Sequence, residues 1–127
     1  MCFKFIGNHR IGEARQKCLD LGAALPLPRS DTEQADLIKI VDHLGAESVV
    51  LGSNEQNSGV YVDSVEHPLT YTAWNGASPT NLPHVTMKFN MKWRAEPGYY
   101  NSNIICVKCH PSYYRGPHTF SEIFLLP

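Results

Sequence analysis

Near the start of the chain stands the segment Glu13-Ala14-Arg15-Gln16-Lys17-Cys18-Leu19-Asp20-Leu21-Gly22-Ala23. Apolar residues recur at helical spacing, and a glycine follows where helices often end; the spaced residues are Ile11, Ala14, Cys18 and Leu21. The pattern predicts a first helix over residues 11–21 whose apolar stripe contains a cysteine.

A second helix is predicted directly downstream. Ser30-Asp31-Thr32-Glu33 has the form of a capping box, in which the Ser30 hydroxyl and the Glu33 carboxylate each accept a hydrogen bond from an amide at the helix start. An apolar stripe then runs to Gly45, through Leu37, Ile38, Val41 and Leu44.

The remaining segments are typical of strands separated by turns. Strands are predicted over residues 3–6, 48–52, 59–62, 84–89 and 103–108, the first ended by a turn at Gly7-Asn8. Long polar loops are predicted over residues 64–83 and 94–102. Two helices followed by several strands indicate the α+β class, because a parallel α/β sheet would need the two element types to alternate.

Composition limits the possible functions. The 127 residues, 43% hydrophobic and 18% charged, suffice for one domain with one core. The formal charge of −1 provides no overall basic field for nucleic acid or an anionic membrane. Because no apolar run reaches the roughly 18 residues of a membrane span, we expect a soluble domain without membrane insertion.

The four cysteines lie only near the two ends of the chain, Cys2 and Cys18 at one and Cys106 and Cys109 at the other. They allow three pairings, and any bond between the two groups indicates an oxidising compartment. A redox or metal pair at Cys106 and Cys109, or covalent haem with His110 as a ligand, is the alternative from the residues alone.

Residues 2–109 resemble the C-type lectin-like domain. Residues 13–23 are similar to its first helix, and Val50-Leu51-Gly52-Ser53 stands where the family usually has Trp-Ile-Gly-Leu. His67 to Trp74 resembles the strand before the long loop, and Ile104-Ile105-Cys106 the closing strand. The resemblance implies two helices packed on small antiparallel sheets with a long loop region, residues 1–109 forming the domain and 110–127 a C-terminal extension.

The resemblance also implies the cysteine pairing. Cys18 would bond Cys106, joining the first helix to the last strand. The family's first and last strands pair antiparallel, which would bring Cys2 to Cys109; a bond from Cys2 to another chain is the alternative. No haem or other cofactor is then expected.

Departures from the family pattern argue against calcium-dependent sugar binding. The family's two oxygen-rich calcium motifs are replaced here by Ser78-Pro79-Thr80 and Trp93-Arg94-Ala95. The strongest calcium ligands of the family are therefore missing, and we expect no bound metal. His84 and Gly98 stand where the resemblance would place an inner loop disulfide. We expect Trp74, Trp93, prolines and tyrosine packing to hold the loops instead.

Enzymatic activity is not predicted. The sequence has no Gly-x-Ser-x-Gly, phosphate loop or His-Glu-x-x-His motif, and its six histidines are scattered singly.

Binding is better supported. Residues 88–94 alternate as in one strand, which would put Lys88, Asn90, Lys92 and Arg94 on one face. Tyr99 and Tyr100 follow as candidate interface anchors. We expect a secreted or cell-surface module that binds a protein through the long-loop face. The alternatives are calcium-independent binding of an anionic glycan, a solvated sheet face without a ligand, and an assembly role in which residues 110–127 meet another chain in an oligomer.

Overall fold

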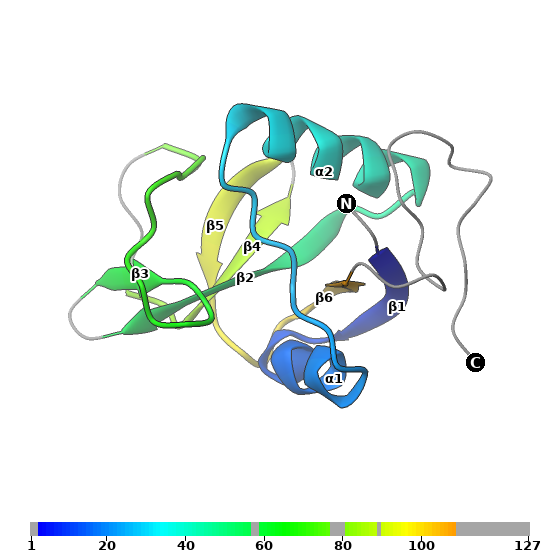
Figure 1. Ribbon diagram of the computed structural model, residues 1–127, viewed down its shortest axis with the longest axis horizontal. Coiled ribbons are helices and arrows are strands. Elements are labelled where there is room, and N and C mark those ends of the chain that lie inside the picture. The colour runs from blue at the N-terminus through cyan, green and yellow to red at the C-terminus, as the bar shows by residue number, and fades with distance from the viewer. Residues whose placement is uncertain (1–2, 57–58, 77–80, 89, 109–127) are drawn as a thin grey trace.

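The computed structural model describes residues 3–56, 59–76, 81–88 and 90–108 (Figure 1). Two helices near the start precede most of the strands, which confirms the α+β class. In chain order the elements are β1 (Phe3–Arg10), η1 (Ile11–Glu13), α1 (Ala14–Asp20), α2 (Asp31–His43), β2 (Ser48–Gln56), β3 (Val60–Val62), β4 (His84–Lys88), β5 (Lys92–Glu96) and β6 (Asn101–Val107). Within these ranges no helix is long and apolar enough to cross a membrane.

The strands form one mostly antiparallel sheet in the order β1-β6-β2-β4-β5, with β3 paired to β2. β1 and β6 pair antiparallel from Phe3↔Val107 to Arg10↔Asn101, with an irregularity between Phe5 and Gly7. The turn predicted at Gly7-Asn8 is therefore wrong. Gly7 takes a φ of 103°, which a glycine tolerates, and the strand continues through this bulge to Arg10.

As predicted, each helix is followed by a glycine with positive φ, and α2 begins directly after Ser30. α1 follows a turn of 3₁₀ helix and ends before Gly22, whose φ is +67°. Ser30 caps α2, since its hydroxyl accepts the Glu33 amide at 3.2 Å. The Glu33 carboxylate accepts the amide of Arg29 at 3.1 Å, one residue before the position that a capping box would use.

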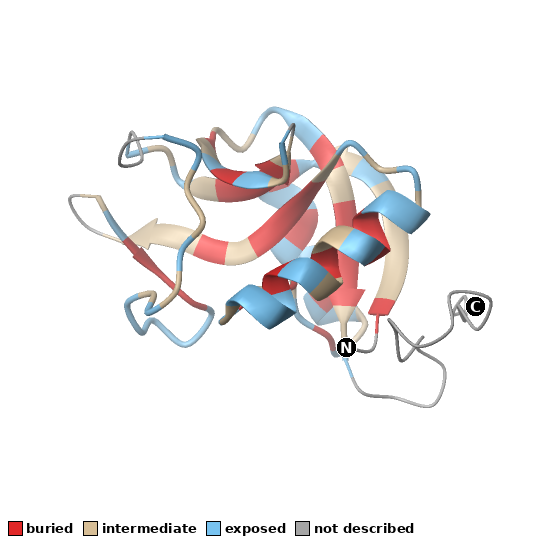
Figure 2. Ribbon diagram, turned by 90° about the horizontal axis from the view of Figure 1, so that it is seen from above, coloured by how far each residue is buried: buried red, intermediate tan, exposed pale blue. Residues whose placement is uncertain are grey.

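The sheet carries a core on each of its two faces. On one face, α2 packs through Leu37, Ile40 and Val41 in a cluster that includes Val49 and Ile105. On the other face, α1 contributes Ala14 and Cys18 to a cluster with Val50, Ile104 and Cys106. Neighbouring residues of β2 and β6 enter different clusters because side chains alternate along a strand. The helices therefore cover opposite faces (Figure 1), and α2 is exposed on its outer side (Figure 2).

A disulfide joins Cys18 on α1 to Cys106 on β6, with the two Cα atoms 5.3 Å apart, which confirms the implied core bond. Both residues are fully buried. Because Cys106 is part of this disulfide, it is not available as the first thiol of a redox pair or of a haem attachment site. Cys2, Cys109 and His110 lie outside the described residues. The bond from Cys2 to Cys109 stays a prediction, although the antiparallel pairing of β1 with β6 that it assumes is present.

Residues 88–94 form a hairpin, and the single strand predicted there is wrong. β4 ends at Lys88, the chain reverses with Met91 at a φ of +59°, and β5 begins at Lys92. Lys88 and Lys92 are cross-strand partners. β5 extends to Glu96 and β6 starts at Asn101, so the loop predicted over residues 94–102 shrinks to residues 97–100.

Candidate binding surface of the hairpin and its loops

The long loop between β3 and β4 is fastened to the hairpin by aromatic side chains. The Trp74 and Trp93 rings meet edge-to-face with centroids 5.8 Å apart, and Tyr61 packs against Trp74 at 5.1 Å. Backbone hydrogen bonds from Asn75 to Trp93 and from Trp93 to Ala73 reinforce the contact. The prediction that Trp74 and Trp93 hold the loop is confirmed.

A buried glutamine ties the same hairpin to α2. The Gln34 side chain donates to the Met91 carbonyl at 2.9 Å and accepts from the Trp93 indole N–H at 3.0 Å. Trp93 is fully buried, so its polar atom needs such a partner. A polar residue inside the α2 stripe is the sequence signal for this contact, which the sequence interpretation missed. These contacts hold the hairpin against α2.

His84 and Gly98 are in contact, as expected of two positions where the resemblance would place an inner disulfide. A Cβ atom added to Gly98 would lie 3.0 Å from the His84 Nε2 atom, so the imidazole covers the glycine. Burial lowers the pKa of His84, which keeps the ring neutral at neutral pH. An uncharged ring and a glycine occupy the position of the missing clamp.

The hairpin brings three cations to one face. Lys88 pairs with Lys92 and Thr86 with Arg94 across the strands, so the three basic side chains share a side of the sheet. We call Lys88, Lys92 and Arg94 the basic patch. Lys92 and Arg94 are exposed, whereas the Lys88 side chain is 26% exposed and its Nζ lies 2.9 Å from the buried carboxylate of Glu96. Glu96, which the sequence interpretation missed, therefore offsets part of the patch's charge.

Asn90 does not lie on this strand face. It occupies the turn between β4 and β5, and its side-chain N–H donates to the side-chain Oδ1 of Asn75 at 3.4 Å. Asn90 therefore connects the hairpin tip to the long loop.

Tyr99 and Tyr100 form a separate patch at the other end of the hairpin. Their side chains are 69% and 49% exposed, and their rings meet edge-to-face at 5.0 Å. Hydrogen bonds from the Ile11 amide to the Tyr100 carbonyl and from the Gly12 amide to the Gly98 carbonyl hold this loop. We call Tyr99 and Tyr100 the tyrosine patch. From Lys92, β5 runs four residues, or about 13 Å, to Glu96, and the tyrosine patch begins three residues after the strand ends. The six residues predicted to bind a ligand therefore do not form one surface: three make the basic patch, two make the tyrosine patch, and Asn90 lies in the turn between β4 and β5.

One acidic residue, Asp63, stabilises the start of the long loop. The buried Asp63 carboxylate accepts the His67 and Val65 amides at 3.0 Å each and the Arg29 guanidinium at 3.3 Å. The hydrogen bond from the His67 amide contributes most to lowering the pKa of Asp63; the Val65 amide and Arg29 add to it, against the opposing effect of burial.

No metal-binding cluster is present in the described part of the chain, where no three His, Cys, Asp or Glu side chains lie close enough to share an ion. Residues 93–95 stand where the resemblance would place the second calcium motif. There Arg94 is exposed, and the Ala95 side chain has no atom that could bind a metal ion. Ser78, Pro79 and Thr80 lie outside the described residues.

Comparisons with known proteins identify similar structures but no similar sequence: no protein-family model and no curated protein matches the chain. The mouse scavenger receptor C-type lectin carbohydrate-recognition domain is similar over 83% of this chain and 87% of that one, with 23% identity and a TM-score of 0.69. A calcium-independent type II antifreeze protein is similar over 83% of each chain, with 21% identity and a TM-score of 0.70. A C-type lectin from Cucumaria echinata is similar over 83% of this chain and 87% of that one, with 18% identity and a TM-score of 0.69. At these identities the likeness concerns the fold alone.

Proposed function

The chain has the C-type lectin-like fold, and we propose that it is an extracellular binding module that recognises a protein partner without calcium-dependent sugar binding. The fold does not select the ligand, since a carbohydrate-recognition domain and a calcium-independent antifreeze protein share it. The ligand class must be argued from the side chains.

The tyrosine patch is the observation that carries the proposal. Two large rings stand in solvent on a loop whose backbone is hydrogen-bonded to residues 11 and 12. Tyrosine offers a wide contact area with few rotatable bonds, so it loses little entropy on binding, and it is enriched at the centres of protein interfaces. Two such rings on a fixed backbone suit a protein surface, and the basic patch would steer an acidic partner.

Calcium independence and location rest on separate arguments. Calcium prefers carboxylate and carbonyl oxygens, and Arg94 and Ala95 supply neither from their side chains. The buried disulfide from Cys18 to Cys106 supports an oxidising, extracellular setting. We infer no cofactor and no enzymatic activity.

A binding screen with matched variants tests the proposal. The full chain, multimerised on a fluorescent carrier, is applied to cells that each display one extracellular protein, with and without calcium chelation. We expect a partner whose binding survives chelation and weakens at least tenfold in a Tyr99→Ala, Tyr100→Ala variant. Lys39→Ala is the control, because Lys39 is exposed on α2 and outside both patches. Binding that needs calcium, or that tolerates loss of both tyrosines, would refute it.

An anionic glycan is the second candidate, because Lys92 and Arg94 are both exposed on one face of β5. Heparin is a suitable probe. In this case affinity would fall steeply with added salt and in a Lys92→Gln, Arg94→Gln variant, while the tyrosine variant would bind normally. An assembly role for residues 110–127, which lie outside the described residues, would appear as a change in oligomeric state when they are deleted.

A further inference from the structure

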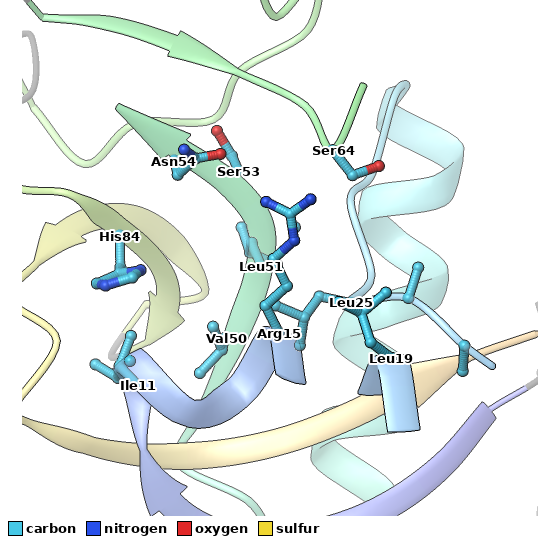
Figure 3. Close-up of a pocket in the computed structure, with 14 residues that line it drawn as sticks. Ile11, Arg15, Leu19, Leu25, Val50, Leu51, Ser53, Asn54, Ser64 and His84 are labelled. Carbon is cyan, nitrogen blue, oxygen red and sulfur yellow. The ribbon is translucent and has the colours of Figure 1, made fainter. Parts of the chain in front are cut away.

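A cavity of about 370 Å³ lies between α1, the segment that follows it and β2 (Figure 3). Its walls are mainly apolar, formed by Ile11, Leu19, Leu25, Val50 and Leu51. A volume of this size is typical of small-molecule sites and would hold a molecule of roughly ten to fifteen non-hydrogen atoms.

One polar end of this pocket has unused binding capacity. The Arg15 side chain extends from α1 over the pocket in the direction of Ser53 on β2 (Figure 3), and it forms no ion pair with any residue of the described ranges. Ser53 is only 5% exposed, yet its hydroxyl has no hydrogen-bond partner there. A buried hydroxyl without a partner destabilises the folded state, so its presence requires an explanation.

The floor of the pocket is preformed. A Cβ atom added to Gly52 would lie 2.9 Å from the Leu25 carbonyl oxygen, so only a glycine allows β2 to approach the segment after α1 this closely. The Gly52 amide donates to the Pro26 carbonyl at 2.8 Å, which fixes the approach. A ligand would therefore meet a rigid wall and lose little free energy in ordering it.

We propose that this pocket binds a small amphipathic carboxylate, with Arg15 and Ser53 holding the carboxylate and the apolar walls covering the remainder of the molecule. The guanidinium presents several N–H donors in a plane that matches two carboxylate oxygens, and the serine hydroxyl adds one donor. The described lining contains no Asp or Glu that would repel an anion. Leu25 and Val50 offer contact to a hydrocarbon chain or ring.

The test compares two probes of equal shape, 4-phenylbutyrate and the uncharged 4-phenylbutanamide, by calorimetry and by amide chemical-shift changes on the full chain. We expect the carboxylate to bind at least tenfold more tightly than the amide and to shift resonances of residues 11–15 and 50–54. Arg15→Gln should weaken 4-phenylbutyrate at least tenfold. Lys17→Gln is the matched control, because it removes the same charge from the same helix outside the pocket.

A third variant separates binding from folding. Ser53→Ala removes the unsatisfied hydroxyl, so it should keep or raise the melting temperature while weakening 4-phenylbutyrate several-fold. Equal affinity for the two probes, equal losses in the Arg15 and Lys17 variants, or shifts confined to the tyrosine patch would each overturn the proposal. Because these readouts need no protein partner, they stand or fall separately from the function proposed above.

Discussion

Replacing His84 and Gly98 by cysteines should install the loop clamp that this chain lacks. The two residues are in contact, since a Cβ atom on Gly98 would fall 3.0 Å from the His84 ring. Removing the imidazole in His84→Cys frees the space that Gly98→Cys needs. The new bond would enclose the whole hairpin from β4 to β5.

The expected gain follows from the length of the closed segment. A bond from position 84 to position 98 closes about 15 residues, which the chain-entropy account equates with about 3 kcal/mol of stability. Loss of the imidazole packing against residue 98 opposes this by about 1 kcal/mol. The net gain of about 2 kcal/mol should raise the melting temperature by roughly 6 °C.

Thermal unfolding and thiol counting together decide the result. The oxidised double variant should melt higher than the wild type without gaining titratable thiols, whereas His84→Cys alone and Gly98→Cys alone should melt no higher and each gain one. Two new free thiols in the oxidised double variant would show that the side chains are not within bonding reach. A formed bond without any stabilisation would refute the entropy argument.

Three further changes test other parts of the structure. Replacing both Cys18 and Cys106 by alanine should lower the free energy of unfolding, measured with urea, by about 4–5 kcal/mol, because the bond spans 88 residues of sequence. Burial lowers the pKa of His84, so below about pH 6.5 the unfolded chain binds more protons than the folded one. The free energy of unfolding therefore falls as the pH decreases toward about 5. His84→Gln should flatten this decline, as measured by thermal melts across that range. Trp93→Phe leaves the Gln34 carbonyl without its donor and should cost roughly 2–4 kcal/mol by urea unfolding, but clearly less in a Gln34→Leu background.

The helices and the alternation of the central strands were predictable because each depends on local chemistry. The Ser30 cap and the glycine after each helix are encoded within a few residues. The reversal at Met91 was not, because strand alternation continues through residues 88–94 and the turn contains no glycine to mark it. A positive φ at a methionine depends on the surrounding contacts rather than on local preference.

The candidate sites depended more strongly on tertiary structure. The pattern placed Lys88, Lys92 and Arg94 on one face correctly, although by way of a hairpin, but it could not reveal that Glu96 reaches Lys88. The pocket unites Arg15 on α1 with Ser53 on β2, and nothing in either segment indicates the other. Such juxtapositions follow from packing.

The position of β6 has a consequence for how the chain folds during synthesis. This strand, the last described in the chain, lies between β1 and β2, and its pairing with β1 joins residues as far apart as Phe3 and Val107. Until the ribosome has released it, β1 and β2 each expose an unpaired edge that can capture another chain. Contacts so distant in sequence also slow the closing step. The nascent protein therefore needs protection from aggregation until its final strand inserts, and truncation before residue 101 would leave that edge permanently open.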